Sequence, residues 1–171
     1  MLKKRIIPVL LYKNNMLVKG KKFKNLRKIS SVISTIKLFN IRQVDELIFL
    51  DITFDANNME PDYDLINHIS QFIFVPLTVG GKIKKIEHIK KLLKSGADKI
   101  SINSEAYYNF QFVKNATSIF GSQCITLSID VKKINEKYFC YSNSGTINTN
   151  YTIEAWLKIV NTFNIGEIIV T

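Results

Sequence analysis

The sequence predicts an α/β fold, more precisely a (β/α)8 barrel of the TIM type in which about six of the eight βα units are present. Short apolar, β-branched runs alternate with amphipathic stretches of helical period. Several of these runs, such as IIPVLL at 6–11 and ITLSID at 125–130, are continuously hydrophobic, as parallel strands covered by helices are. An open dinucleotide-binding sheet would carry a Gly-rich loop after its first strand, and YKNNMLVKG stands there instead, so we favour the barrel.

The first half of the chain supplies three predicted strand–helix pairs. The strand at 5–11 is followed by a basic loop and then by a helix at 31–40, whose apolar residues recur every three to four positions. The strand at 47–53 contains LIFLDI and leads to a helix at 63–72. The strand at 74–79 leads to a helix at 86–94 through LTVGGKIKK. We expect these pairs to repeat one βα unit.

The second half continues the pattern with one excursion. A strand at 99–103 precedes a helix at 110–120, and the strand at 124–130 precedes a segment, 131–150, that lacks helical period. That segment contains KYFCYSNSG, so we predict a hairpin above the fifth strand. A helix at 153–163 and a strand at 167–171 end the chain, and residues 1–171 form one partial barrel domain in this prediction.

The composition indicates a globular, cytoplasmic protein. The chain is 46% hydrophobic and 22% charged, and it contains neither a run of about 20 apolar residues nor a signal-peptide cleavage pattern. Cys124 and Cys140 are expected to be reduced structural thiols, and we expect no metal and no cofactor. The net charge of +10 suggests an anionic partner. Nucleic acid is disfavoured because the basic residues are not interleaved with aromatic residues and form no recognisable motif.

The end of the sequence is unusual for a barrel. GEIIVT forms a complete apolar strand, and the sequence contains no later helix or strand to cover or pair it. A complete barrel has eight strands and about 250 residues, and a six-stranded arc would leave sheet edges unpaired. We therefore expect a truncated sequence or a fragment.

Two glycine or small-polar turns follow neighbouring strands of the predicted barrel. Gly80 and Gly81 come directly before a helix, and Asn103 and Ser104 end the next strand in SINSEA. Glycine allows close approach of the backbone, and a helix start presents free N–H groups. These turns either bind a phosphate group or are ordinary loops. Their occurrence on adjacent strands makes phosphate binding a stronger interpretation than a single turn would.

Charged residues at the strand ends form two further groups. Asp130 ends a buried strand and is either a general acid or base or a turn-capping carboxylate, whereas for Asp51 a structural role is favoured. At the opposite ends, charged residues stand at or just before four strands, and they would either neutralise one another at the barrel floor or simply be solvated. This second group is Arg5, Glu46, Lys99 and Glu167.

The sequence resembles the cyclase subunit of imidazole glycerol phosphate synthase over the whole chain. The resemblance is carried by seven segments in order: KRIIPVLL, VKGKKFKNLR, VDELIFLDIT, PLTVGGKI, GADKISIN, FGSQCITLSID and GEIIVT. It implies a barrel that accepts ammonia from a glutaminase partner in a heterodimer and delivers it to a phosphorylated substrate. It implies no membrane span.

The resemblance also implies roles for single residues. Asp130 would be one of two catalytic aspartates, Asp98 would face the glutaminase, and Lys19 would belong to a mobile loop over the site. The charged gate of the ammonia passage would be Arg5, Glu46, Lys99 and Glu167. One substrate phosphate would be bound by Gly80, Gly81, Asn103 and Ser104.

Two positions depart from the pattern of that family. Leu11 stands where the second catalytic aspartate is expected, and Lys82 replaces a third glycine. An aliphatic side chain cannot transfer a proton, so the ring-forming step of the family would lack one of its two catalytic carboxylates. The combination resembles a paralogous branch associated with sugar amidation in surface-polysaccharide biosynthesis, with a nucleotide-sugar acceptor. That is our leading hypothesis; the alternatives are histidine biosynthesis itself, and a non-catalytic scaffold or truncated remnant.

Overall fold

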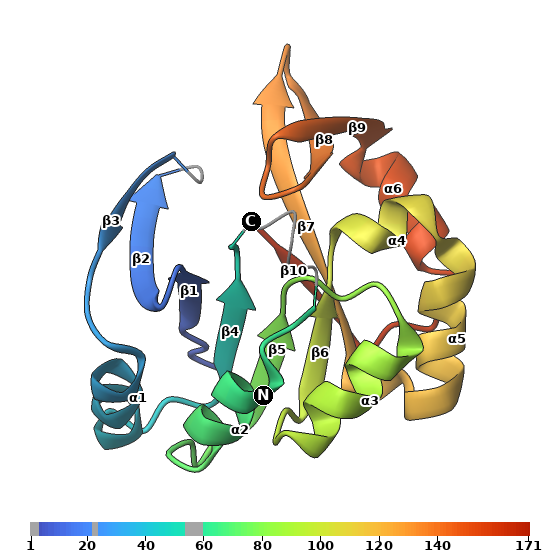
Figure 1. The fold of residues 1–171 in the computed structure, drawn as a ribbon. Coiled ribbons are helices and arrows are strands. Elements are labelled where there is room, and N and C mark those ends of the chain that lie inside the picture. The colour runs from blue at the N-terminus through green and yellow to red at the C-terminus, as the bar shows by residue number, and fades with distance from the viewer. Residues whose placement is uncertain (1–3, 22–23, 54–59) are drawn as a thin grey trace. The chain divides into compact units, whose positions relative to one another are not determined.

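The computed structural model describes residues 4–21, 24–53 and 60–171. The chain divides into two compact units, Met1–Ile83 with Glu87–Ile100, and Lys84–Ile86 with Ser101–Thr171 (Figure 1). Strand β6 (Lys99–Ile102) runs across this division. Each unit is described by itself below.

The first unit is a mixed sheet with helices packed against it. Its strands are β1 (Val9–Lys13), β2 (Met16–Lys21), β3 (Lys24–Lys28), β4 (Leu47–Asp51) and β5 (Leu77–Gly80), in the spatial order β3-β2-β1-β4-β5. β1, β4 and β5 pair in parallel, and β2 and β3 add an antiparallel hairpin at the edge. The helices are α1 (Val32–Ile41), α2 (Tyr63–Ser70) and α3 (Ile86–Lys94).

The core of this unit forms because strands and helices each bury an apolar face. Leu47, Phe49 and Leu77 are at most 1% exposed in the parallel strands, and Ile69 and Ile89 are fully buried on the helices. The parallel register places Leu11 opposite Leu50, and Leu50 opposite Gly80, while Tyr12 lies opposite Asp51. The carboxyl ends of the three strands therefore lie in one row.

The second unit joins a parallel strand pair to a long antiparallel hairpin. Its elements are α4 (Ser104–Tyr108), α5 (Phe110–Phe120), η1 (Ser122–Cys124), β7 (Ile125–Ile134), β8 (Lys137–Ser142), β9 (Ile147–Thr152), α6 (Ile153–Val160) and β10 (Glu167–Val170). β10 pairs with β7 in parallel, and β7, β8 and β9 pair in antiparallel order. The first six residues of β7 are buried, and its later residues extend into the hairpin.

Trp156 is the centre of the apolar core beside this hairpin. It is fully buried, its ring stacks on Tyr107 at 4.3 Å between centroids, and Tyr151 and Phe163 contact its other sides. Three helices contribute to this cluster, since α4 supplies Tyr107, α5 supplies Phe110 and α6 supplies Trp156 itself. The hairpin strand β9 supplies Tyr151. The cluster fixes α6 against the hairpin.

The predicted α/β class and all six predicted strands are confirmed, as is the hairpin within 131–150. Two strand starts were placed too early. β1 begins at Val9 and β5 at Leu77, each directly after a proline, Pro8 and Pro76. Proline has no N–H to donate to a ladder, so the regular pairing starts one residue later.

The basic loop predicted after the first strand is wrong, because most of it forms β2 and β3. Asn14 and Asn15 have φ of +48° and +64°, the left-handed pair that a two-residue hairpin turn requires. Helix α4 was also missed; it is a single short turn of five residues. Cys140 is fully buried and Cys124 is partly buried, and the two are not joined by a disulfide bond. No helix in the described part of the chain is long and apolar enough to cross a bilayer.

Candidate functional site

Glu46 bridges two cations at the amino ends of the strands in the first unit. It lies just before β4, and its side chain is 7% exposed. One carboxylate oxygen accepts a hydrogen bond from the Arg5 guanidinium, and the other accepts one from Lys99 Nζ at 3.0 Å. The Lys99 side chain is 18% exposed, whereas that of Arg5 is 48% exposed. Three of the four predicted floor charges therefore meet.

Asp98 and Glu167 lie beside strand starts as the sequence predicted. Asp98 is exposed, yet its carboxylate accepts a hydrogen bond from the Leu77 N–H at 2.8 Å, and its own N–H donates to the Leu77 carbonyl. Glu167 is the first residue of β10, opposite Thr126 of β7, and is partly buried in the second unit. The Asp98 carboxylate therefore helps to hold the start of β5, while the residue remains exposed to solvent.

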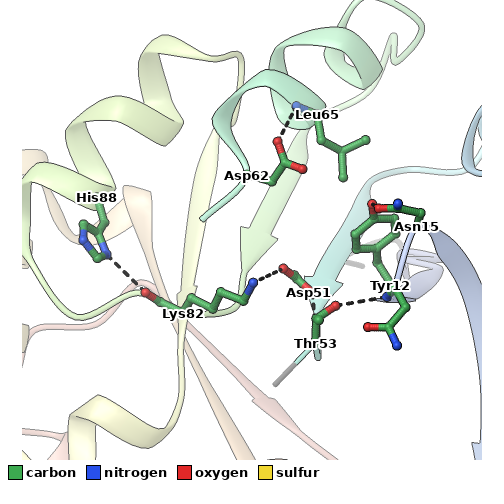
Figure 2. A network of polar contacts seen from close by, with 9 residues as sticks. Tyr12, Asn15, Asp51, Thr53, Asp62, Leu65, Lys82 and His88 are labelled. Carbon is green, nitrogen blue, oxygen red and sulfur yellow. Dashed lines mark hydrogen bonds and ion pairs between the residues drawn. The ribbon is translucent and has the colours of Figure 1, made fainter. Parts of the chain in front are cut away.

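The turn after β5 is closed tightly against the end of β4. Gly81 has φ of +114°, and a Cβ at this position would lie 2.2 Å from the Asp51 carbonyl oxygen, so only glycine fits. Lys82 follows with φ of +58°, a left-handed value that also suits glycine. Its ammonium lies 3.3 Å from Asp51 Oδ2, and both side chains are 13% exposed (Figure 2).

His88 supports this turn from α3. Its side chain is 4% exposed, and Nδ1 lies 3.1 Å from the Lys82 carbonyl oxygen (Figure 2). Nε2 lies 3.2 Å from Glu60 Oε1. Both ring nitrogens of His88 therefore face acceptor oxygens. The backbone of Lys82 is therefore held in place by a buried side chain.

Leu11 and Tyr12 end the first parallel strand. Leu11 is half-buried beside Leu50, and Tyr12 is 6% exposed with its ring 5.2 Å from that of Phe49. The Tyr12 hydroxyl donates to Asn15 Oδ1 at 2.9 Å. Burial, together with nearby carboxylates, raises the pKa of Tyr12, so the phenol stays protonated.

A polar pocket of about 350 Å³ lies at these strand ends. Sequence reasoning missed most of its walls, although the Asn-Asn pair between two apolar runs and an Asp directly before a helix are readable signals. The lining residues are Tyr12, Asn14, Asn15, Asp51, Thr53, Asp62 and Lys82.

Asp130 is the buried carboxylate of the second unit. It is 6% exposed; Oδ1 accepts from the Thr171 hydroxyl at 2.8 Å, and Oδ2 accepts from Asn103 Nδ2 at 3.1 Å. Burial raises its pKa, and these two hydrogen bonds oppose that rise. Ser104 Oγ accepts from the Asn143 N–H at 2.9 Å and so ties α4 to the hairpin.

Lys19 is not in a loop, which corrects the sequence prediction. It lies in β2, opposite Arg27 of β3, and is exposed. The strand forms because the Asn14–Asn15 turn reverses the chain and lets β2 pair with β1 over three residue pairs. A mobile loop is therefore replaced by a hairpin at this position.

Comparison with known proteins identifies the family. The family model described as "Histidine biosynthesis protein" matches residues 5–171. The "Imidazole glycerol phosphate synthase subunit HisF" of Staphylococcus carnosus is 41% identical over 173 residues, covering 100% of this chain and 68% of that protein. The "Putative imidazole glycerol phosphate synthase subunit hisF2" of Campylobacter jejuni is 45% identical over 172 residues, with the same coverage.

The chain belongs to the histidine biosynthesis protein family. Within this family it is a HisF-type protein, since the relatives that match it along its whole length carry that name. The names of these relatives describe them as subunits of imidazole glycerol phosphate synthase. This HisF-type chain has an ion cluster around Glu46 and a buried carboxylate, Asp130. It has leucine at position 11 of β1.

Proposed function

We propose that this HisF-type chain is an ammonia-using synthase subunit that works with a glutaminase. The observation that carries the proposal is Glu46 held between Arg5 and Lys99 at the strand entries. The cluster of one buried carboxylate and two cations carries one positive charge in excess, so it can line a passage without attracting a cation from solvent. A neutral ammonia molecule can pass such a group, whereas ammonium would meet the two cations.

The remaining predicted roles belong to the same proposal. Asp98 would contact the glutaminase on its exposed face, and Glu167 would complete the gate. A substrate phosphate would be bound by Gly80 and Gly81 together with Asn103 and Ser104. Lys19, on the edge hairpin, would contact the substrate through its exposed ammonium.

Asp130 would act as the general acid or base. Because burial raises its pKa, the carboxyl group holds its proton at a higher pH than an exposed aspartate does. Thr171 and Asn103 fix both of its oxygens, and so orient the group for proton transfer. Leu11 contributes no proton, so this chain performs acid–base steps from one carboxyl rather than two.

The acceptor that the relatives' names favour is the imidazole-pathway precursor of histidine biosynthesis. The names of relatives from Staphylococcus carnosus and Streptococcus mutans both specify imidazole glycerol phosphate synthase. In this candidate function, ammonia enters the precursor and the chain closes the imidazole ring.

A second candidate acceptor is a sugar or nucleotide sugar that becomes amidated. Two observations favour it: Leu11 cannot take part in proton transfer, and Lys82 fills the glycine turn and pairs with Asp51. Both changes leave the ion cluster around Glu46 intact. Ammonia delivery would then be retained while ring closure is lost.

One experiment tests the proposal and separates the two acceptors. The chain is combined with the glutaminase partner of a HisF-type relative, and glutamine hydrolysis and imidazole glycerol phosphate formation are measured. The variants are Glu46→Gln and the exposed-pair control Glu136→Gln. Support is glutaminase stimulation that Glu46→Gln reduces and Glu136→Gln leaves unchanged. Imidazole formation then selects histidine biosynthesis, and its absence selects the sugar acceptor. No binding or stimulation of the glutaminase rejects the proposal.

A further inference from the structure

The pocket at the carboxyl ends of β1 and β4 has a consistent chemical character. Its volume of about 350 Å³ lies in the range of small-molecule sites. The described residues that line it supply a phenol, two amides, a hydroxyl, two carboxylates and an ammonium, and none of these residues is aliphatic. A ligand that fits must therefore offer many hydrogen-bonding groups over a small volume.

The cation of the pocket is already neutralised. Lys82 Nζ lies 3.3 Å from Asp51 Oδ2, and the two side chains are equally buried (Figure 2). Asp51 is itself oriented by the Thr53 N–H, which donates to its Oδ1 at 2.8 Å. His88 holds the Lys82 backbone from behind through the carbonyl oxygen. Lys82 is thus a fixed partner of Asp51, and an anionic ligand would have to compete with that carboxylate.

The overall charge of the pocket also disfavours an anion. Among the described residues that line it, Asp51 and Asp62 are carboxylates and Lys82 carries an ammonium. Lys82 is paired with Asp51, so these described side chains supply one negative charge in excess. A phosphate or carboxylate placed in the pocket would be repelled by Asp62.

The pocket groups retain hydrogen-bonding capacity after their internal contacts. Asp62 Oδ1 caps α2 by accepting from the Leu65 N–H at 2.9 Å, and Oδ2 is a second acceptor. Asn15 uses its carbonyl oxygen for the Tyr12 hydroxyl, and its amide nitrogen carries two donors. The Lys82 ammonium has three N–H donors, and one of them points toward Asp51. Donors and acceptors therefore alternate around one cavity, with the Tyr12 side chain forming part of the wall.

We propose that this pocket binds the neutral, polyhydroxylated ring of a sugar. A hydroxyl group both donates and accepts, so a ring carrying several hydroxyls matches a wall that mixes ammonium, amide and carboxylate groups. Asp62 accepts from one hydroxyl, and Lys82 and Asn15 donate to others. The inference deepens the sugar-acceptor candidate and rests on it for its biological meaning, while the binding itself follows from the pocket.

The test is a titration followed by saturation-transfer NMR, with the methyl glycosides of glucose, galactose and mannose and with inorganic phosphate as probes. At least one glycoside is expected to bind with a Kd of about 1 mM, the range typical of a few hydrogen bonds, and phosphate is expected not to compete. Asp62→Asn keeps the helix cap but loses the charged acceptor, so it weakens binding about tenfold. Lys82→Gly suits the left-handed backbone and removes a donor, so it weakens binding similarly.

The control variant is Lys90→Ala, an exposed lysine on α3 outside the pocket lining, which leaves binding unchanged. The proposal is overturned if no glycoside binds, if phosphate displaces the glycoside, or if Asp62→Asn and Lys82→Gly both bind as the unaltered chain does. Glutaminase stimulation is measured on the same preparations. Loss of sugar binding with normal stimulation removes this inference alone, whereas absent stimulation removes the proposed function.

Discussion

Replacing Glu46 by glutamine is the most direct perturbation of the strand-entry cluster. The substitution keeps the size of the side chain but removes the charge that Arg5 and Lys99 share. Removing one partner of a buried ion pair costs about 3–5 kcal/mol, because the remaining charge stays buried. Here the Arg5 side chain is 48% exposed, so water stabilises it, and only Lys99, at 18% exposed, is left substantially buried.

The expected loss for Glu46→Gln is therefore about 2–3 kcal/mol in the free energy of unfolding, below the full buried-pair value. Urea denaturation followed by circular dichroism measures it. With a slope of about 2 kcal/mol per molar urea, the midpoint falls by about 1–1.5 M. The slope itself is expected to stay constant.

The matched control is Glu136→Gln. Glu136 also forms an ion pair, with Lys133 at 2.8 Å, but its side chain is 89% exposed, so the change is expected to stay below about 0.5 kcal/mol. If the two variants shift the urea midpoint equally, the cluster around Glu46 is not buried in solution. The reasoning about a buried carboxylate that lines a passage would then be refuted.

Three further predictions concern single residues. Gly81→Ala, whose Cβ would lie 2.2 Å from a backbone oxygen, is expected to destabilise the fold by clearly more than the approximately 1–2 kcal/mol of a left-handed alanine, as denaturation measures. Burial raises the pKa of Asp130, so the stability of the folded protein falls as pH rises above 3.8, the ordinary pKa of an aspartate. Asp130→Asn is expected to remove that fall and to be more stable than the unaltered chain at neutral pH. Thermal melting at several pH values measures both effects. Burial raises the pKa of the Cys140 thiol to about 11, so a thiol reagent at pH 8 is expected to modify it only on unfolding.

Each of these predictions has a variant that isolates its cause. Gly121 also has a positive φ, yet a Cβ there has no neighbour within 4 Å, so Gly121→Ala should show the backbone strain without the clash. Equal losses for the two glycine variants would contradict the close contact. For Asp130, the parallel comparison is Asp64→Asn on the exposed surface of α2, which should keep the slope with pH. For Cys140, the control is Cys140→Ser. If this variant loses part of the rapid thiol modification that the folded, unaltered chain shows at pH 8, the Cys140 thiol is accessible in the folded protein.

The order of strands and helices was predictable because it depends on periodicity. Helices at Ile86–Lys94 and Phe110–Phe120 match the predicted bounds, since an apolar residue every three to four positions defines both the helix and its buried face. Strand starts were less accurate at Pro8 and Pro76, where the missing N–H, rather than hydrophobicity, sets the boundary. The edge hairpin was missed because charged residues obscure its alternation, although the Asn14–Asn15 turn signals it.

The sequence alone determined that Asp130 would be a buried carboxylate after an apolar run, and that charges would stand at the strand entries, because both follow from position relative to an apolar run. The structure places Asp130 at the end of the buried part of β7, which continues to Ile134. Only the tertiary structure decided the partners of these groups. That Glu46 meets both Arg5 and Lys99, and that Lys82 reaches Asp51, depends on the register of parallel strands separated by tens of residues. Local pattern fixes which side chains are buried, whereas the distances between them are set by how the strands align.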